Sequence, residues 1–228
     1  MTQPSPGPDR GSAFAHLAID LHAAPGVDET VQAVVDFALQ AIGCDYAGVT
    51  LTRPGEQADI AAVTDPVVEQ ILRWQLDVGD GPLRTVLETA ATVHVADAAT
   101  EDRWPTWTQL VAGLIGSVLD VPLIAKKIVI GVLSLYHDKP NGFSCDDEAI
   151  AHILARHASI ALATARREAQ LIQRVDARKL VGQAQGILME RHNLTADQAF
   201  DVLRRYSQDT NTKLRDVAQQ VIDNRRKP

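Results

Sequence analysis

The sequence predicts an α+β domain, in which helices flank a central antiparallel sheet, joined by a long helix to an all-α bundle of three helices. Three observations lead to this fold class. Alternating apolar segments upstream of Ser144 read as two hairpins between helical stretches. From Ser144 a helical pattern runs without Pro or Gly as far as Gly182, and two further amphipathic stretches follow Asn193.

Composition divides the 228-residue chain into unlike parts. The start, rich in Pro, Gly and Ser and without an apolar core, predicts a disordered leader at 1–11 and not a signal peptide. Residues 12–165 are expected to form the α+β domain, and residues 166–228 the stem continuation and bundle. Residues 1–165 carry 9 Lys and Arg against 21 Asp and Glu, whereas residues 166–228 carry 13 against 8. An anionic partner is therefore expected on the C-terminal part.

Local patterns predict each element of the first domain. The stretch "DETVQAVVDFALQAIG" has an acidic start, helical apolar spacing and a final Gly, so it predicts a helix. A hairpin is expected from "YAGVTLT" through a turn at Pro54 and Gly55. Next come a helix in "DPVVEQILRWQL", a turn in "DVGDGPL", a short strand in "TVHVAD" and a further helix.

A second hairpin, "GLIGSVLDVPLI" and "IVIGVLSLYHD", completes the expected sheet. Its later strand is apolar on both faces, which predicts a place in the middle of a sheet covered on both sides. Ser144, with Asp147 three residues on, forms an approximate capping box at the start of the long helix.

Six segments of this domain resemble, in order, signatures of the GAF domain, the small-molecule-sensing and dimerising module of many bacterial regulators. They are "IGCDYAGVTL", "DVGDGPL", "VADAATEDRWPTW", "SVLDVPLI", "IVIGVLSLYHDKPNGFS" and "DDEAIAHILARHASIAL". The resemblance covers about residues 12–170 and implies a sensory fold without specifying a ligand. Leu83 stands where many relatives carry Cys, so no thiol-based sensing is expected there.

A ligand pocket is expected, by analogy with GAF-like folds, between the sheet and the "DGPL" and "RWPTW" loops. Its candidate residues are Tyr46, Arg84, Trp104 and Trp107. The alternative is that the tryptophans pack in the core and that Arg84 is solvated or ion-paired.

No motif predicts a metal, a cofactor or a catalytic site. His94 and His137 have no partner at metal-ligand spacing, and Cys44 and Cys145 form neither a CxxC motif nor a disulfide framework. No run of about 18 or more uncharged apolar residues predicts a membrane span. The two separate cysteines are typical of a reducing cytoplasm, and the lack of a catalytic motif predicts a protein without enzymatic activity. A GAF-fold thiol enzyme that uses Cys44 or Cys145 is the alternative.

The long helix carries one stripe of residues at spacings of three and four, mostly apolar, with small residues in its middle. Its members are Ile150, Leu154, Ala158, Ala161, Ala165, Glu168, Ile172 and Val175. This pattern predicts a homodimer through paired stems. Packing of the helix on its own sheet is an equal explanation for residues 145–163.

After Asn193, Thr195 and Gln198 predict a capping box, and two further apolar stripes complete a small bundle. The segment "ARKLVGQAQGILMERHNLTADQAFDVLRRYSQDTNTKLRDVAQQVI", from Ala177 to Ile222, closely resembles the ANTAR domain, the antiterminator module of regulators of the AmiR and NasR type. The resemblance implies that the protein binds paired RNA hairpins in leader transcripts, and so regulates transcription by antitermination. Gln185 stands where the family frequently has Lys.

The polar surface of this module supplies the expected RNA contacts, each of which is alternatively a solvated helix residue. The candidates are Arg178, Lys179, Gln183, Gln185, Arg204, Arg205 and Lys213. Gly182, Ala184 and Gly186 are expected at a site of close helix packing, with close approach of RNA as the alternative. A DNA-binding regulator is the remaining alternative for the whole module.

Overall fold

The computed structural model describes residues 21, 24–53, 55 and 57–224. The leader expected at 1–11 lies outside these residues. The chain divides into two compact units, Met1–Arg166 and Arg167–Pro228, and the division falls inside one long helix. No described helix combines the length and the apolar character that are needed to cross a membrane.

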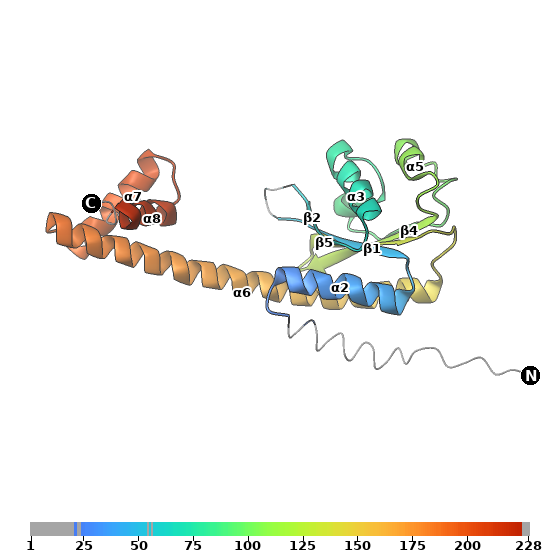
Figure 1. Cartoon of the computed structure of the whole chain (residues 1–228), viewed down its shortest axis with the longest axis horizontal. Helices are drawn as coiled ribbons and strands as arrows, with labels where there is room; N and C mark the ends of the chain where they lie inside the picture. The colour runs from blue at the N-terminus through green and yellow to red at the C-terminus, as the bar shows by residue number, and fades with distance from the viewer. Residues whose placement is uncertain (1–20, 22–23, 54, 56, 225–228) are drawn as a thin grey trace, which may run out of the picture. The chain divides into compact units, whose positions relative to one another are not determined.

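A five-stranded antiparallel sheet forms the centre of the first unit (Figure 1). In chain order the strands are β1 (Tyr46–Leu51), β2 (Asp59–Val63), β3 (Val93–Val95), β4 (Ser117–Ala125) and β5 (Ile128–His137). The spatial order is β2-β1-β5-β4-β3, so the doubly apolar strand β5 lies in the middle, as its sequence predicts.

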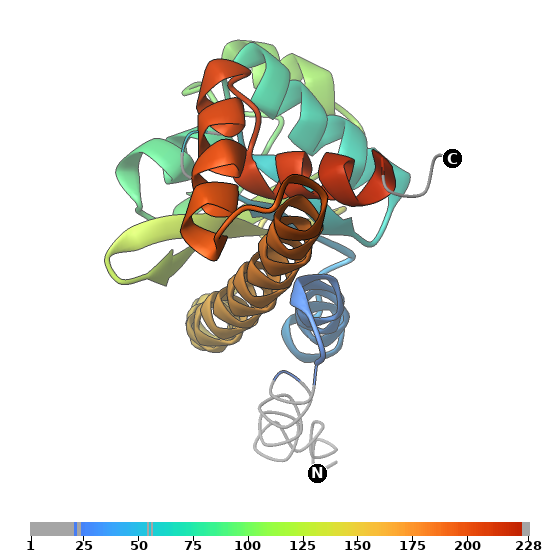
Figure 2. The ribbon, with the colours of Figure 1, turned by 90° about the vertical axis from the view of Figure 1, so that its left-hand side faces the viewer.

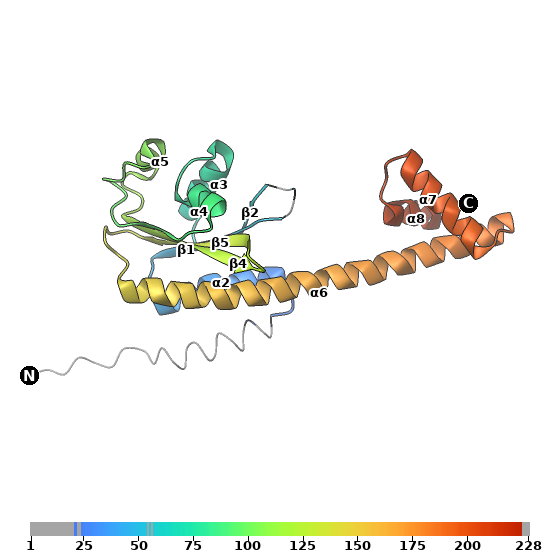
Figure 3. The same cartoon turned by 180° about the vertical axis from the view of Figure 1, so that it is seen from behind.

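Helices cover both faces of this sheet. Helix α2 (Val27–Ile42) and the first part of α6 (Cys145–His192) lie side by side on one face (Figures 1 and 2). The opposite face is covered by α3 (Pro66–Val78), α4 (Pro82–Thr89) and α5 (Pro105–Val111) (Figure 3). Strand β5 serves both cores, because Leu133 and Leu135 join the first and Val132 and Tyr136 the second. The expected α+β arrangement is confirmed.

Local signals set the helix ends. Asp65 caps α3 by accepting a hydrogen bond from the Val67 amide at 2.8 Å. Ser144 and Asp147 form the expected reciprocal cap of α6: the Ser144 amide donates to Asp147 Oδ2 at 2.9 Å, and the Asp147 amide donates to Ser144 Oγ at 3.2 Å. The "DGPL" segment differs from expectation, since Pro82 occupies the first position of helix α4 directly after the turn. Proline is favourable at that position because it has no amide hydrogen to leave unpaired.

The second unit contains the end of α6, α7 (Ala196–Asp209) and α8 (Leu214–Asn224), which pack as a small bundle (Figure 2). Helix α6 ends before Asn193, which takes the left-handed conformation at φ 52°. Thr195 and Gln198 then form the predicted capping box of α7. The buried hydrophobic residues described in this bundle are Ala184, Ile187, Ala199, Leu203, Val217 and Ala218.

The apolar stripe of α6 does not remain free for pairing along its length. Leu154, Ala158 and Ala161 are buried in the core between α2, α6 and the sheet, and Ala165 is also buried. The expected pairing surface is therefore wrong over Ala158–Ala165, where the helix packs on its own sheet. Farther along, Leu171, Ile172 and Val175 are 51%, 63% and 64% exposed.

Candidate nucleic-acid interface

The bundle carries cations that are free to meet phosphates. Arg178 and Lys179 on α6, Arg205 on α7 and Lys213 before α8 are exposed, and none has an ion-pair partner within the described residues. Arg204 pairs with Asp201 at 2.9 Å, but both side chains are about 60% exposed, so that pair is weak and exchangeable. Phosphates can therefore compete for every one of these cations.

The two glycines of α6 face open space. A Cβ atom built on Gly182 or Gly186 meets no heavy atom within 4 Å outside the helix's own backbone, and both residues are exposed. The expectation of close packing is wrong for both glycines within the chain, whereas Ala184 is fully buried. Gln183 lies exposed between Gly182 and Ala184. A stretch of backbone without side chains is thus accessible beside Arg178 and Gln185, which lie four and three residues from Gly182 on the helix.

A groove beside these glycines is formed where the three helices meet. It has a volume of about 430 Å³. Its lining residues are Ala177, Arg178, Val181, Gln185, Phe200, Leu214 and Arg215. The sequence-derived candidates Arg178 and Gln185 are brought together here. Phe200 and Arg215 also line the groove, although neither of them was among the candidate RNA contacts predicted from the sequence.

Gln185 is held in a fixed orientation at the edge of this groove. Its Nε2 atom donates a hydrogen bond to the Ala196 carbonyl at 3.2 Å. A carbonyl oxygen can only accept, so the amide nitrogen must face Ala196 and the Oε1 atom is left as a free acceptor. A lysine at this position would provide no acceptor.

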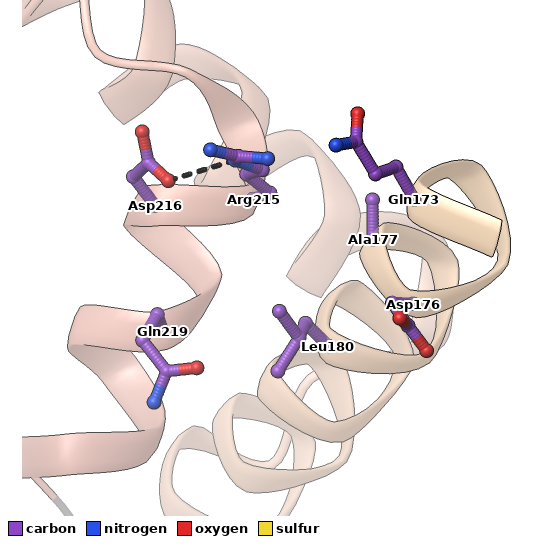
Figure 4. Close-up of a pocket in the computed structure, with 7 residues that line it drawn as sticks. All are labelled: Gln173, Asp176, Ala177, Leu180, Arg215, Asp216 and Gln219. Carbon is purple, nitrogen blue, oxygen red and sulfur yellow. Dashed lines mark hydrogen bonds and ion pairs between the residues drawn. The ribbon is translucent and has the colours of Figure 1, made fainter. Parts of the chain in front are cut away.

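A second hollow, of about 300 Å³, lies between α6 and α8 (Figure 4). Gln173, Asp176, Ala177 and Leu180 line it from α6, and Arg215, Asp216 and Gln219 line it from α8. Arg215 Nε is 3.1 Å from Asp216 Oδ1. Because two carboxylates border this hollow, it is less suited to a phosphate than the groove beside Phe200.

The four pocket candidates of the α+β unit do not share one environment. Trp107 has no exposed surface and packs edge to face on Trp104, with ring centroids 6.2 Å apart. Tyr46 is half-buried against the same core, whereas Arg84 is exposed and pairs with Glu88 at 2.7 Å. The packing and ion-pair alternative accounts for Trp107 and Arg84.

A buried polar cluster on the same face of the sheet was not foreseen from the sequence. Asp120 and Ser134 are register partners on β4 and β5, and Tyr136 lies two residues farther along β5. All three are fully buried, and within the described residues neither carboxylate oxygen of Asp120 has a hydrogen-bond partner. Burial raises the pKa of Asp120 to about 7.

Among the described residues, the cysteines and histidines are not grouped into a reactive centre. Burial raises the pKa of the Cys44 thiol to about 12, so the thiolate needed for nucleophilic chemistry is scarce at neutral pH. Cys145 is exposed at the start of α6, and both cysteines are free. His137 Nδ1 lies 2.9 Å from Asp45 Oδ2. Within the described part of the chain, no three His, Cys, Asp or Glu residues are grouped so that they could hold a metal ion.

Comparison with known proteins yields two family matches. The model described as GAF domain matches residues 24–163, and the model described as ANTAR domain matches residues 169–222. No curated protein sequence matches the chain.

Three solved structures illustrate the similarity of the first unit. The GAF domain from a phosphoenolpyruvate-protein phosphotransferase of Coxiella burnetii is 20% identical, with 71% of this chain and 97% of that chain covered and a TM-score of 0.61. Free methionine-R-sulfoxide reductase of Neisseria meningitidis, in complex with its substrate, is 15% identical, with 74% of this chain and 98% of that chain covered and a TM-score of 0.56. A GAF domain/HD domain protein of Geobacter sulfurreducens is 19% identical, with 64% of this chain and 97% of that chain covered and a TM-score of 0.51. At these identities the likeness shows the fold alone.

Proposed function

The chain belongs to the GAF domain family and continues into an ANTAR domain, and from this premise we propose that it is an antitermination regulator that binds RNA hairpins in nascent transcripts. The domain pair confirms both resemblances seen in the sequence, in the same order. The observation that supports RNA binding most directly is a group of exposed cations on the bundle that have no ion-pair partner among the described residues: Arg178, Lys179, Arg205 and Lys213. The GAF domain is a sensory domain.

The mechanism we propose needs no chemistry. Cations neutralise phosphates of the hairpin, and the side-chain-free surface at Gly182 and Gly186 lets the RNA backbone come close to α6. Two bundles hold paired hairpins in a leader transcript, so that a terminator hairpin cannot form from the same RNA. Because nascent transcripts are made in the cytoplasm of bacteria, we propose that the protein acts there.

Removing one phosphate contact should weaken the salt dependence of RNA binding. Each neutralised phosphate releases condensed counterions, so the Arg205→Ala variant is expected to reduce the magnitude of the negative slope of log affinity against log salt by roughly 0.7, the value for single-stranded loops. Lys213→Ala should do the same. The measurement is titration of a two-hairpin RNA at several salt concentrations, with helicity checked first.

Arg73→Ala is the matched control, because Arg73 is an exposed arginine of the α+β unit and should not affect the slope. Equal slopes for wild type, Arg205→Ala and Lys213→Ala would place the phosphate contacts elsewhere. Tighter binding of duplex DNA than of hairpin RNA in competition would favour the DNA-binding alternative.

We propose a homodimer through the later part of α6, where Leu171, Ile172 and Val175 leave three large apolar side chains more than half exposed. In an isolated chain these apolar side chains stay in contact with water, which is unfavourable. A second copy of the chain would bury them in a coiled-coil contact. Ile172→Glu with Val175→Glu is expected to yield monomers in light scattering. Ala161 is unsuitable for this test because it is buried in the chain's own core. An unchanged mass for the double variant would remove this part of α6 from the interface.

The signal enters, in this proposal, through the α+β unit as an unidentified small molecule or regulatory partner. The buried orphan oxygens of Asp120 lie on the sheet face that α3, α4 and α5 cover, which is where the Trp104 and Trp107 pair also lies. A catalytic role for this unit finds no support in the chemistry of Cys44.

A further inference from the structure

We propose that the groove beside Phe200 holds one unpaired base of a hairpin loop, which stacks on the Phe200 ring and is read by Gln185. The inference rests on the proposed RNA function and assigns the specificity of that function to one site. It starts from Phe200, an aromatic side chain that α6 and α8 leave 36% exposed at the wall of a groove.

The groove combines the two features that single-stranded bases require. Its apolar part, formed by Ala177, Val181 and Leu214 with the Phe200 ring, suits the face of a base. Its rim carries Arg178 and Arg215, which suit the phosphates on either side. A volume of about 430 Å³ lies within the range of roughly 300–1,000 Å³ that is typical of small-ligand sites.

Gln185 determines which base edge the site prefers. Because one Nε2 hydrogen donates to the Ala196 carbonyl, Gln185 keeps its Oε1 acceptor and its second Nε2 hydrogen for a ligand. An acceptor pairs with a donor, and the exocyclic amino group of adenine or cytosine is such a donor. Adenine also offers the larger stacking face, so we infer that adenine is the preferred base. The Lys that relatives frequently carry here would meet a phosphate and would not read an amino group.

The geometry around α6 allows a loop to reach this site. Gly182 lies next to Arg178 and Gln185 on the helix surface, and no side chain or neighbouring element occupies the space where its Cβ would be. Arg178 has no ion-pair partner in the described chain, so binding a phosphate breaks no existing pair. The loop backbone can therefore pass over Gly182 while one base turns into the groove.

The test uses the full-length protein and an RNA that it selects itself from a two-hairpin library with randomised loops. Each loop position of the selected RNA is then made abasic in turn. For wild type, removal of one particular base is expected to weaken binding about tenfold, which corresponds to about 1.4 kcal/mol and lies within the measured range for stacking of one base. Phe200→Leu is expected to bind the intact RNA about tenfold more weakly and to lose nothing further when that base is removed, because the two changes delete the same contact.

Three variants separate stacking from a general disturbance of the bundle. Tyr206→Leu removes an aromatic ring that is 52% exposed on the same helix and does not line the groove, so it should respond to base removal as wild type does. Phe200→Tyr keeps the ring and should retain the tenfold effect. Gln185→Lys should abolish the difference between adenine and its analogue without the amino group, while affinity for the RNA remains.

The outcomes distinguish this inference from the function it rests on. Selection that yields no RNA overturns the RNA-binding function itself and the base site with it. RNA that binds tightly, but in which every abasic substitution weakens wild type and Phe200→Leu by the same factor, overturns the base site alone.

Discussion

Replacing Leu203 by Ala is expected to unfold the helical bundle and abolish RNA binding while the α+β unit stays folded. Leu203 is 1% exposed and, with Ile187 and Val217, is one of three side chains larger than Ala among the buried hydrophobic residues described in the bundle. Truncation of a buried Leu to Ala costs about 2–5 kcal/mol because it removes apolar burial and leaves a cavity. A unit of this size has little stability beyond that amount.

The chain provides its own reporters for this experiment. All three tryptophans, Trp74, Trp104 and Trp107, lie in the first unit, so their fluorescence follows the unfolding of that unit alone. Leu203→Ala should leave the fluorescence transition unchanged and lower the helical signal in circular dichroism. Val202→Ala is the matched control, since Val202 is its 47% exposed neighbour and should change neither signal. Full helicity and wild-type RNA affinity in Leu203→Ala would show that the bundle does not depend on this core.

The parts of the fold that the sequence predicted are those determined by local signals. The Thr195 and Gln198 cap, the end of α6 at Asn193 and the central place of β5 follow from residue types at fixed spacings. Helix α4 was missed because Gly81 and Pro82 read as a continuing turn, although Pro82 is also a favourable first helical residue. The local pattern could not decide between these two uses of one dipeptide.

The residues that line the candidate groove could not be predicted from local patterns, because they depend on how the three helices of the bundle pack together. Phe200 belongs to the apolar stripe of α7, yet only the crossing of α6, α7 and α8 determines that it lines a groove while Leu203 is enclosed. For the same reason the sequence favoured close packing at Gly182 and Gly186, whereas the placement of the neighbouring helices leaves both glycines facing open space. The residues Arg178 and Gln185 were found from the family motif, but Arg215 required the folded bundle.

Because of Asp120, the free energy of unfolding of the α+β unit is expected to decrease as the pH rises. It is fully buried between β3 and β5 in the sheet, and its pKa is raised from an ordinary value of 3.8 to about 7, chiefly by burial. Between about pH 4 and pH 7 the folded state therefore keeps a proton that the unfolded state has released. The free energy of unfolding decreases as the pH rises through this window, by up to about 1.4 kcal/mol per pH unit, and becomes level above it.

Asp120→Asn should remove this dependence, because an amide fills the same volume without a charge that burial penalises. At pH 7.5 the variant is expected to be more stable than wild type by up to about 4 kcal/mol, and the difference should shrink steadily towards pH 4. Urea unfolding followed by tryptophan fluorescence at several pH values measures this difference in the unit that contains Asp120. Asp59→Asn, which removes an exposed carboxylate from edge strand β2, is the control and should run parallel to wild type. If Asp120→Asn also runs parallel to wild type from pH 4 to pH 8, the carboxylate is ionised in the folded protein, and a buried group outside the described contacts must stabilise its charge.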